Sequence, residues 1–422
     1  MPRVITDKQQ VEELLTRGVE NIYPGKENLK KKLLSGEKIR LYCGYDPTAP
    51  ALHIGNAISI SKLGQFQALG HEVIFLIGDF TGIIGDPTDK KAARKKLTRE
   101  EVLANAANYK EQASAYLKFT GDNPAKIMYN SSWNDKLNFR DLIELSSNFT
   151  VQQMIQRDMF QERLKEEKPI YLHEFLYPLT QAYDSVVMDV DLEIGGNDQM
   201  FNMMCGRSLL KALKNKEKSV LTLKLLADES GKKMGKSEGN VVFLDEPAND
   251  MYGKIMSWPD GVIVSAFELC TLVPLAEVKN IAKSLQGEQA NPRDFKMKLA
   301  FEITKINHGP EAAEAAQTHF INTIQKKEIP ADKDIPQYSV SKAKNSLIDL
   351  LVETKLAKSK TEARQKISEG AIKIKIESRA KKNNQEEMAV VSDVKSEIDF
   401  SAGIASVILQ KGKFTFVRVL PL

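Results

Sequence analysis

The stretch IRLYCGYDPTAPALHIGNAISISKLGQFQALGHEVIFLIG, residues 39–78, decides the fold class of the chain. Residues 39–44 predict a strand, and residues 73–78 predict a second strand that is apolar enough to be buried. Between the two, residues 56–69 have the spacing of apolar side chains that is typical of a helix, which ends at Gly70. A strand, a helix and a strand in this order form a βαβ unit and predict an α/β fold, with a parallel sheet flanked by helices. In such sheets ligands bind beyond the carboxyl ends of the strands, near the N-termini of helices.

The first 330 residues divide into two parts of different pattern. Residues 1–240 alternate strand-like and helix-like segments and predict a Rossmann-like domain with a parallel sheet. Residues 241–330 turn helical. The clearest helix of this second part is 291–306, where Asn291 is a candidate N-cap and Pro292 suits the first turn.

A linker precedes the last domain of the chain. Residues 326–341 contain Pro330, Pro336 and a run of charges, which are typical of a linker, and we expect the domains to be joined by residues 331–343. Residues 344–422 then predict a small α+β domain. Its helix-like segments are 347–356 and 361–368, and its strand-like segments include 371–376 and 414–420.

Length and composition exclude several classes of protein. With 422 residues the chain is too long for one hydrophobic core, because domains cluster near ~100–150 residues. Apolar residues make up 42% and charged residues 27%, as in ordinary globular proteins, and no apolar run reaches the ~18 residues of a membrane helix. Residues 1–8, MPRVITDK, lack the apolar stretch of a secretory signal. The three distant cysteines, Cys43, Cys205 and Cys270, predict neither a metal site nor disulfides, so we expect a cytoplasmic protein.

Charge is distributed unevenly along the chain. The net charge of +4 results from 60 basic and 56 acidic residues. Residues 341–422 hold 16 Lys and Arg against 10 Asp and Glu, an excess of +6, which leaves −2 for all the residues before them. This positive balance suggests an anionic partner for the last domain. On charge alone, a solvated basic surface explains it equally well.

The first group of candidate functional residues surrounds the end of the first predicted strand. The sequence YCGYDPT, residues 42–48, is followed by HIGN, residues 53–56, where the predicted helix begins. Gly55 has no side chain, so a flat adenine ring can lie against the backbone there. His53 and Thr48 offer neutral donors to a phosphate at the positive end of the helix. Taken alone, a histidine at a helix start is more often a cap or a surface residue.

The second group is the lysine-rich sequence GKKMGKSEGN, residues 231–240. Its three lysines among glycines predict a strongly cationic loop. Such a loop can close over a triphosphate and neutralise charge that develops in a transition state. Taken alone, the segment is slightly better explained as an exposed basic loop.

The third group is YPLTQAYD, residues 177–184. Tyr177, Gln181 and Asp184 fall at positions i, i+4 and i+7, which share one face of a helix. Pro178 is tolerated only in the first turn, so the helix is predicted to begin near Tyr177. A face with a carboxylate and a carboxamide suits a ligand with a hydroxyl at one end and an ammonium at the other. Apolar flanking residues argue against a solvated face, and a buried Asp184 needs a partner.

The first two groups, on a βαβ frame, resemble the class I aminoacyl-tRNA synthetases. The two hallmark motifs of that class are His-Ile-Gly-His and Lys-Met-Ser-Lys-Ser. This chain departs from them at Asn56, which keeps a hydrogen-bonding side chain, and at Gly235, which loses only a hydroxyl. The outer lysines of the second motif, Lys233 and Lys236, are present, so neither departure argues against activity.

The third group extends this resemblance to the bacterial-type tyrosyl members of the class. The resemblance implies a homodimer that activates tyrosine with Mg²⁺-ATP to tyrosyl-adenylate and pyrophosphate, and then transfers tyrosine to the 3′ end of tRNA(Tyr). It implies no tightly bound cofactor, no metal site and no membrane. By resemblance, Tyr42 and Asp184 bind the phenolic hydroxyl of tyrosine. The other implied tyrosine-binding residues are Asp86, Tyr177 and Gln181 at the α-ammonium, with Asn130 and Gln199 helping to position the substrate.

The same resemblance implies a nucleotide site and a phosphate clamp. The implied ATP-binding residues are Cys43, Gly44, Asp46, His53, Gly55, Gly196, Asp198 and Lys236. The implied catalytic residues are Thr48, His53, Asn56, Lys90, Arg94, Lys233 and Lys236, and the last four of these would hold pyrophosphate. Catalysis would then consist of positioning and charge stabilisation, without a covalent nucleophile. A local departure, Met200-Phe201 where many members have Trp-Gly, concerns packing more than chemistry.

The end of the chain resembles the S4 RNA-binding module. The resemblance rests on LLVETKLAKSKTEAR, residues 350–364, and GAIKI, residues 370–374. A longer polar stretch, residues 376–385, stands where the module usually has a short Asn-Gly turn. The residues implied to contact RNA phosphates are Lys358, Lys360, Arg364 and Lys373. The resemblance therefore predicts three domains: a catalytic Rossmann-like domain, a helical domain that contacts tRNA, and an S4-like domain.

Three alternatives differ from this interpretation at definite residues. A tryptophanyl enzyme shares the scaffold but has little use for the pair Tyr42 and Asp184. A nucleotidyltransferase of another pathway shares the first motif yet needs no RNA-binding domain. A non-catalytic RNA-binding relative would be expected to lose some of the residues that carry the chemistry, and all of these are present: His53, Lys233, Lys236, Tyr42 and Asp184.

Overall fold

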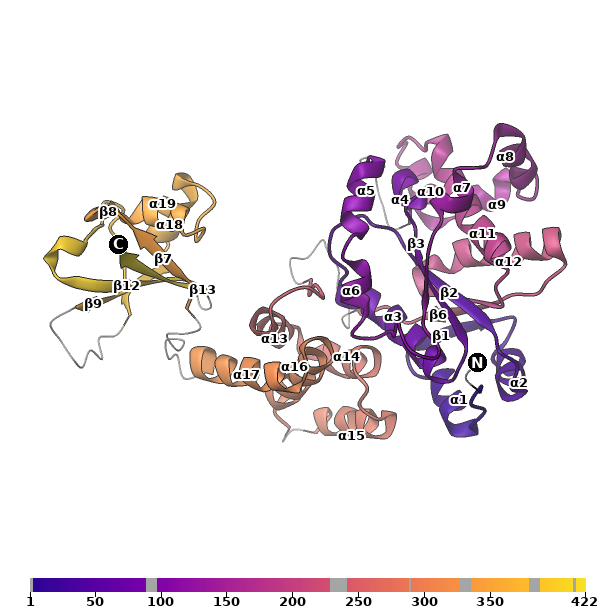
Figure 1. Ribbon diagram of the computed structural model, residues 1–422, viewed down its shortest axis with the longest axis horizontal. Coiled ribbons are helices and arrows are strands. Elements are labelled where there is room, and N and C mark those ends of the chain that lie inside the picture. The colour runs from indigo at the N-terminus through magenta and orange to yellow at the C-terminus, as the bar shows by residue number, and fades with distance from the viewer. Residues whose placement is uncertain are drawn as a thin grey trace. The chain divides into compact units, whose positions relative to one another are not determined.

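A computed structural model describes residues 3–88, 97–227, 241–287, 290–325, 335–378, 388–412 and 415–422. The chain folds into two compact units, Met1–Glu314 and Ala315–Leu422 (Figure 1). The sequence motif at 231–240 lies outside the described residues. So do the four residues expected to hold pyrophosphate, Lys90, Arg94, Lys233 and Lys236.

A six-stranded sheet lies at the centre of the first unit. In spatial order its strands are β1 (Val19–Tyr23), β6 (Ser219–Leu223), β5 (Leu192–Gly196), β2 (Arg40–Tyr45), β3 (Glu72–Ile77) and β4 (Lys126–Tyr129). β1 is antiparallel to β6, and the other neighbours are parallel. The predicted βαβ unit is confirmed, because β2, α3 (Ile54–Ala68) and β3 follow one another and β2 pairs with β3 in parallel.

Helices lie on both sides of this sheet, with α3 and α6 on one side and α11 and α12 on the other (Figure 1). The buried faces of β2, β3 and α3 supply much of the core, including Leu41, Phe75, Ile60, Leu63 and Phe66. The remaining helices of this part are α1 (Lys8–Leu14), α2 (Lys26–Leu34), α4 (Thr81–Ile84), α5 (Arg99–Ala106), α6 (Tyr109–Ala113), α7 (Ser131–Asn134), α8 (Phe139–Ser146), α9 (Val151–Ile155), α10 (Asp158–Lys165), η1 (Leu172–Phe175), α11 (Leu176–Met188), η2 (Asn197–Gln199) and α12 (Met200–Lys214).

The helical pattern predicted over residues 241–330 is also confirmed in the described residues. It forms α13 (Ala248–Met256), η4 (Asp260–Val262), α14 (Ile263–Cys270), α15 (Leu275–Leu285), α16 (Pro292–His308) and α17 (Pro310–Phe320), followed by η5 (Ile321–Gln325). Asn291 caps α16 as predicted, since its side chain accepts the backbone N–H of Arg293 at 3.1 Å. Pro292 occupies the first turn, where no backbone donor is needed.

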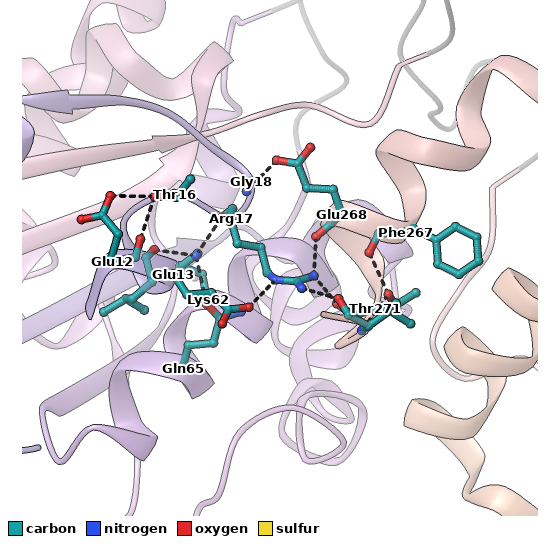
Figure 2. A network of polar contacts seen from close by, with 12 residues as sticks. Glu12, Glu13, Thr16, Arg17, Gly18, Lys62, Gln65, Phe267, Glu268 and Thr271 are labelled. Carbon is teal, nitrogen blue, oxygen red and sulfur yellow. Dashed lines mark hydrogen bonds and ion pairs between the residues drawn. The ribbon is translucent and has the colours of Figure 1, made fainter. Parts of the chain in front are cut away.

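Arg17, which follows α1, joins the helix α14 to the sheet part of the first unit (Figure 2). Its guanidinium donates to the backbone carbonyls of Glu268 and Thr271, each at 3.1 Å. The Glu268 carboxylate in turn accepts the Gly18 N–H at 3.0 Å. On the other side, the ammonium of Lys62 in α3 donates to the Arg17 carbonyl at 2.9 Å. One buried group of polar contacts therefore connects α3 with α14.

The second unit is a small α+β domain, as the sequence predicts. Its main sheet has the order β10 (Ala389–Val390), β9 (Ile372–Ser378), β12 (Ile404–Lys411), β13 (Thr415–Pro421) and β7 (Gln337–Val340). A second, two-stranded sheet pairs β11 (Glu397–Asp399) with β8 (Lys344–Ser346). The helices α18 (Leu347–Glu353) and α19 (Lys360–Ser368) share a hydrophobic core with the strands, to which Leu350, Leu351, Ile367 and Val407 contribute.

The linker predicted over residues 326–341 is wrong in its last part. Residues Gln337–Val340 form β7, which pairs in parallel with β13. The preceding Ile335 is buried and packs with Ile408 and Phe416. The prolines and charges of this segment suggested a linker, but the strand depends on a partner more than 70 positions away, which local composition does not indicate.

Two further properties concern the whole described chain. Across the described ranges, no helix is both long and apolar enough to span a membrane. Cys43, Cys205 and Cys270 are buried free thiols.

Candidate active site

The strand order of the first sheet reverses between β2 and β5. From β2 the sheet continues through β3 to β4 on one side, while β5 and then β6 lie on the other. Open parallel sheets bind ligands beyond the carboxyl ends of the strands at such a point. The pairing of β2 with β5 covers Leu41–Leu192 and Tyr42–Glu193, whereas its pairing with β3 continues to Tyr45. Gly44 is exposed while its neighbours in β2 are buried, so backbone is open to a ligand at this place.

His53 is the N-cap of α3 and forms a capping box with Asn56. The backbone N–H of Asn56 donates to His53 Nδ1 at 3.3 Å, and Asn56 Oδ1 accepts the backbone N–H of His53 at 3.0 Å. Because Nδ1 accepts, the neutral imidazole carries its proton on Nε2, which makes it a donor, as a phosphate contact requires. A Cβ atom on Gly55 would lie 3.0 Å from the imidazole, so glycine at 55 leaves room for this ring orientation.

The chain that follows the lysine-rich motif runs beside the start of α3. The Ile54 N–H donates to the Val242 carbonyl at 2.9 Å, and the Leu244 N–H donates to the Leu52 carbonyl at 2.8 Å. His53 and Phe243 form an antiparallel bridge between these bonds. The second sequence motif is therefore followed directly by a segment that is hydrogen-bonded to the first.

α11 presents the third group of predicted residues, and it begins at Leu176 with Pro178 in its first turn, close to the predicted start. Asp184 is 1% exposed. Its Oδ1 accepts from Trp133 Nε1 at 2.7 Å and Asn134 Nδ2 at 3.3 Å, and its Oδ2 accepts from Asn130 Nδ2 at 3.2 Å. Burial raises the pKa of the Asp184 carboxyl to about 8, although these donors act in the opposite direction.

Tyr42 lies with Asp184 in the same buried region. Tyr42 and Trp133, a donor to Asp184, belong to one hydrophobic cluster. The Tyr42 hydroxyl lies 3.0 Å from Ser185 Oγ. Burial, and then the charges of Glu193 and Asp184, raise the pKa of Tyr42 well above its ordinary value, so this phenol stays protonated. A buried hydroxyl and a buried carboxyl thus lie on either side of Trp133, whose ring packs in the cluster of Tyr42 and whose N–H bonds Asp184.

A chain of hydrogen bonds connects this pair to the loop after β2. The Tyr177 hydroxyl donates to Asp46 Oδ2 at 2.8 Å. The Thr81 hydroxyl donates to Asp46 Oδ1 at 2.6 Å and accepts from Asn130 Nδ2 at 3.0 Å. Since Asn130 Nδ2 also donates to Asp184, the carboxyl ends of β2, β3 and β4 are tied to α11.

A second set of contacts orders the remaining polar residues expected at the amino-acid site. Gln199 Nε2 donates to Asp86 Oδ2 at 2.7 Å. The Thr88 hydroxyl and backbone N–H donate to the other oxygen, Asp86 Oδ1, at 2.7 and 2.9 Å. Gln181 Nε2 donates to Glu193 Oε1 at 3.1 Å. Asp86 therefore carries a carboxylate fixed by three donors, as a binding group for an ammonium needs.

Of the residues expected at the nucleotide, five lie at or just after the carboxyl ends of the two diverging strands, namely Cys43, Gly44, Asp46, Gly196 and Asp198. Cys43 is buried in β2, and burial raises the pKa of its thiol to about 11, so it is neutral. Thr48, in the loop after β2, is partly exposed. Gly196 ends β5, and a Cβ there would lie 2.5 Å from Asp198 Oδ1, so a larger residue would displace that carboxylate.

Several residues of this site are not indicated by the sequence motifs. They are Thr81, Trp133, Asn134, Ser185, Glu193 and Lys218, all of which contact predicted site residues or one another. The available signal was the sequence NSSWN, residues 130–134, which follows the edge strand β4 directly and places hydrogen-bonding side chains at its carboxyl end.

The residues expected to bind RNA lie on three elements of the second unit. Lys360 and Arg364 are exposed on α19, and Lys358 is exposed just before it. Lys360 Nζ lies 2.7 Å from Asp349 Oδ1, so part of its charge is already compensated. Lys373 is partly buried in β9. The three residues near α19 form a group, and Lys373 belongs to the sheet.

Sequence comparisons place almost the whole chain within known families. Residues 34–325 match the family described as "tRNA synthetases class I (W and Y)", and residues 328–419 match the "Tyrosine--tRNA ligase SYY-like C-terminal domain". The curated "Tyrosine--tRNA ligase" of Thermotoga maritima is 42% identical over 371 residues, which are 88% of this chain and 90% of that protein. The protein of the same name from Moorella thermoacetica is 40% identical over 410 residues, 96% of this chain and 94% of the relative.

Solved structures share the fold of the first unit. A C-terminally truncated mitochondrial tyrosyl-tRNA synthetase of Aspergillus nidulans matches with a TM-score of 0.63 and 21% identity, over 73% of this chain and 92% of its own. A tyrosyl-tRNA synthetase of Archaeoglobus fulgidus complexed with L-tyrosine matches with a TM-score of 0.58 and 23% identity, over 74% of this chain and 100% of its own. At these identities the likeness concerns the fold alone.

Proposed function

This chain belongs to the class I tRNA synthetases of the tryptophan and tyrosine group, and we propose that its substrate is tyrosine. The observation that carries the choice is the pair Tyr42 and Asp184, a buried hydroxyl and a buried carboxyl that have Trp133 as a common neighbour. Such a pair gains further hydrogen bonds from a phenol, and a substrate without a hydroxyl would leave these bonds unmade. An indole ring makes less use of it, which favours tyrosine over tryptophan.

The proposed reaction has two steps that balance without a protein nucleophile. An oxygen of the tyrosine carboxylate attacks the α-phosphorus of Mg²⁺-ATP, the bond to the β-phosphate breaks, and pyrophosphate leaves. A ribose hydroxyl at the 3′ end of tRNA(Tyr) then attacks the carbonyl carbon of tyrosyl-adenylate, loses its proton, and AMP leaves. The protein accelerates both steps by positioning the reactants and by stabilising charge.

The amino acid would lie with its phenol toward Asp184 and its ammonium toward Asp86. The Asp86 carboxylate, held by Thr88 and Gln199, supplies the charge for the ammonium. Tyr177 and Gln181 lie on the same helix as Asp184, and their polar ends would complete the ammonium site. Asn130 holds Asp184 and Thr81 together and would position the substrate indirectly, with Gln199 acting in the same way on Asp86.

ATP would lie at the diverging ends of β2 and β5. Its phosphates would meet the positive N-terminus of α3, where His53 Nε2 and Thr48 act as donors and Asn56 keeps the His53 ring in place. The backbone of Gly44 and Gly55 leaves room for the nucleoside, with Cys43, Asp46, Gly196 and Asp198 around it. The clamp for pyrophosphate would consist of Lys90, Arg94, Lys233 and Lys236, which we assign from the sequence motifs.

The tRNA would contact the helices α13–α17 and the second unit. Lys358, Lys360, Arg364 and Lys373 are the candidate phosphate contacts, and the charge excess of +6 over residues 341–422 supports an anionic partner. Free, buried cysteines fit the reducing cytoplasm, which is the proposed location.

A homodimer is the proposed assembly. Large apolar side chains are exposed between α8 and η1, with Phe139 at 78%, Val151 at 73% and Leu172 at 79%. A surface on which such side chains adjoin one another would suit an interface with a second copy of the chain. The others in this segment are Ile143, Leu164 and Tyr171.

The test is a pair of activities on the purified full-length chain. ATP–pyrophosphate exchange should depend on tyrosine and should be far weaker with phenylalanine or tryptophan. Tyrosine should then appear on tRNA(Tyr) and not on tRNA(Trp). Exchange that prefers tryptophan, or no exchange with any amino acid, would reject the proposed substrate.

A further inference from the structure

A buried ion pair lies beneath the amino-acid site. The ammonium of Lys218, just before β6, bonds the Glu193 carboxylate of β5, and the two side chains are 0% and 2% exposed. Replacing such a pair by apolar residues is often neutral for stability, so stability alone does not account for it. Its contacts point to a different role.

The ion pair holds two residues of the site. Glu193 Oε1 accepts from Gln181 Nε2 at 3.1 Å. Glu193 Oε2 accepts from Ser185 Oγ at 3.3 Å, and Lys218 Nζ donates to the same Ser185 Oγ at 2.8 Å. Ser185 Oγ lies 3.0 Å from the Tyr42 hydroxyl. Glu193 thus contacts Gln181 directly, and it acts on the Tyr42 hydroxyl both directly and through Ser185.

The direction of these hydrogen bonds follows from which groups can donate. An ammonium only donates and a carboxylate only accepts. Ser185 has one proton, so it accepts from Lys218 and gives its proton to Glu193. With that proton on Glu193, Ser185 accepts from the Tyr42 hydroxyl, which is one of the two directions that their 3.0 Å contact allows. The Tyr42 oxygen is left with lone pairs for the pocket and acts there as an acceptor.

Gly206 leaves room for the ammonium of Lys218, the Ser185 hydroxyl and the Glu193 carboxylate. A Cβ on Gly206 of α12 would lie 2.6 Å from Lys218 Nζ, 2.9 Å from Ser185 Oγ and 3.2 Å from Glu193 Oε2. A side chain at 206 would therefore displace the ammonium and the serine together. Glycine in the middle of a helix has a conformational cost, which the room for the three polar groups explains.

We propose that Glu193 and Lys218 are positioning residues that orient the Tyr42 hydroxyl as a hydrogen-bond acceptor, and so select an amino acid whose para group donates. This inference rests on the proposed function, because it assumes that the para group of the substrate meets Tyr42. It predicts that removing the ion pair lowers discrimination between para groups with and without a donor, although neither residue touches the substrate.

The decisive variant is Glu193→Gln combined with Lys218→Met, which removes both charges and leaves similar volumes. The amide introduced at 193 can donate to Ser185, so Ser185 no longer has to accept from Tyr42. The ratio of kcat/KM for tyrosine to that for 4-fluorophenylalanine, measured by pyrophosphate exchange, should fall ~10-fold or more. KM for ATP should change by less than ~2-fold and Tm by a few degrees. An unchanged ratio in this variant would overturn the proposal.

Ser185→Ala tests the path by which the ion pair acts. It removes the serine that contacts Tyr42, Glu193 and Lys218 and keeps both charges, so it should lower the same ratio. Added to the double variant, it should produce no further loss, because both changes break one chain of hydrogen bonds. Fully additive losses would show that the ion pair and Ser185 do not act on the same hydroxyl, and would also overturn the proposal.

A second buried ion pair provides a matched control. Arg163 and Glu174 are 1% and 4% exposed, and their other hydrogen bonds run to Pro169 and Tyr171. Arg163→Met with Glu174→Gln should leave the ratio of the two kcat/KM values unchanged. An equal fall of this ratio in the control variant would show that loss of any buried ion pair has this effect, and would overturn the proposal. If the unaltered chain shows no tyrosine-dependent exchange, the proposed function fails instead of this inference.

Discussion

The Tyr177 hydroxyl donates a 2.8 Å hydrogen bond to Asp46 Oδ2. Tyr177 belongs to the helix that carries the amino-acid residues, and Asp46 belongs to the loop that leads from β2 to His53. The bond therefore joins the two halves of the proposed site, which are more than 130 residues apart in sequence. It also orients the Tyr177 oxygen, so that its remaining lone pairs can accept from an ammonium.

Tyr177→Phe should raise KM for tyrosine ~10-fold or more, because a hydrogen bond to a charged ligand is worth more than a neutral one. Pyrophosphate exchange at varied tyrosine concentration measures this. Tyr183→Phe, on the same helix, is the control and should leave KM within ~2-fold. Equal effects of the two variants would contradict the assignment of Tyr177 to the ammonium site.

Tyr42→Phe should lower the preference for tyrosine over phenylalanine and leave measurable activity. A site that pairs a substrate hydroxyl discriminates by up to ~10⁴–10⁵-fold, and removing one of its two partners should remove a large part of this factor. Tyr45→Phe is a matched control, since Tyr45 is also a buried tyrosine of β2, with its hydroxyl 3.0 Å from Ser59 Oγ. The pocket assignment is wrong if Tyr42→Phe and Tyr45→Phe give the same preference.

The phosphate clamp should affect rate more than ground-state binding, because its charges meet pyrophosphate as it develops. Lys236→Ala should slow adenylate formation ~10²-fold or more, with the Kd for tyrosine nearly unchanged. Rapid-quench kinetics and equilibrium binding separate the two quantities. Lys216→Ala, which removes a lysine paired with Asp189, should change neither. Loss of tyrosine affinity at a normal rate would contradict the clamp.

His71 should make the free energy of unfolding depend on pH. It is fully buried, and burial, helped by Lys38, lowers its pKa from 6.5 to about 4. Between these pH values the unfolded chain binds the proton and the folded chain does not, so stability falls as pH drops from 6.5 to 4, by up to about 3 kcal/mol. Urea unfolding at pH 7 and pH 5 measures this. His71→Gln keeps an acceptor for the Ile39 N–H and should show a smaller difference between the two pH values.

Ending the chain at residue 325 should separate the two half-reactions. The cut lies before Ile335 and β7, which belong to the second unit, so the Rossmann-like part is left intact. Tyrosine-dependent pyrophosphate exchange should survive, while tRNA charging should collapse or require much more tRNA. Exchange lost together with charging would mean that the second unit stabilises the first.

The same prediction can be tested in the full chain. Lys358→Glu with Arg364→Glu should weaken charging and reduce the salt dependence of tRNA binding, because each phosphate contact contributes about one unit to the slope. Lys395 is an exposed lysine elsewhere in the domain. Lys395→Glu tests whether the change in net charge alone weakens tRNA charging. Charging that is unaffected by the first pair would remove α19 from the RNA-binding surface.

The parts of this protein that follow from local pattern were predictable. The βαβ unit of residues 39–78, the cap of α16 at Asn291 and the start of α11 near Pro178 each depend on neighbouring residues in the chain. The position of Tyr177, Gln181 and Asp184 on one helix follows from the period of the helix itself.

The rest depends on pairings between distant segments, which produce no periodic pattern of apolar residues in the local sequence. The strand order that brings β2 beside β5, the bridge between His53 and Phe243, and the strand β7 are of this kind. So is the ion pair of Glu193 and Lys218, since a lysine after a run of polar residues looks like solvated surface until its strand is placed in the sheet. The sequence led to the residues expected to meet the substrate and to some that hold them, such as Asn130, but not to Trp133, Ser185 or Lys218.

The three donors on Asp184 bear on any redesign of this pocket for unnatural amino acids. A bulky para substituent requires a smaller or apolar residue at 184, but that change alone would leave the Trp133 indole N–H and the amides of Asn130 and Asn134 without their acceptor. A buried donor without a partner costs about 1–3 kcal/mol, and here several arise at once. Asp184 and the three donors that follow β4 should therefore be varied together. Libraries that vary positions 130, 133, 134 and 184 at once should yield folded variants that libraries of a single position miss.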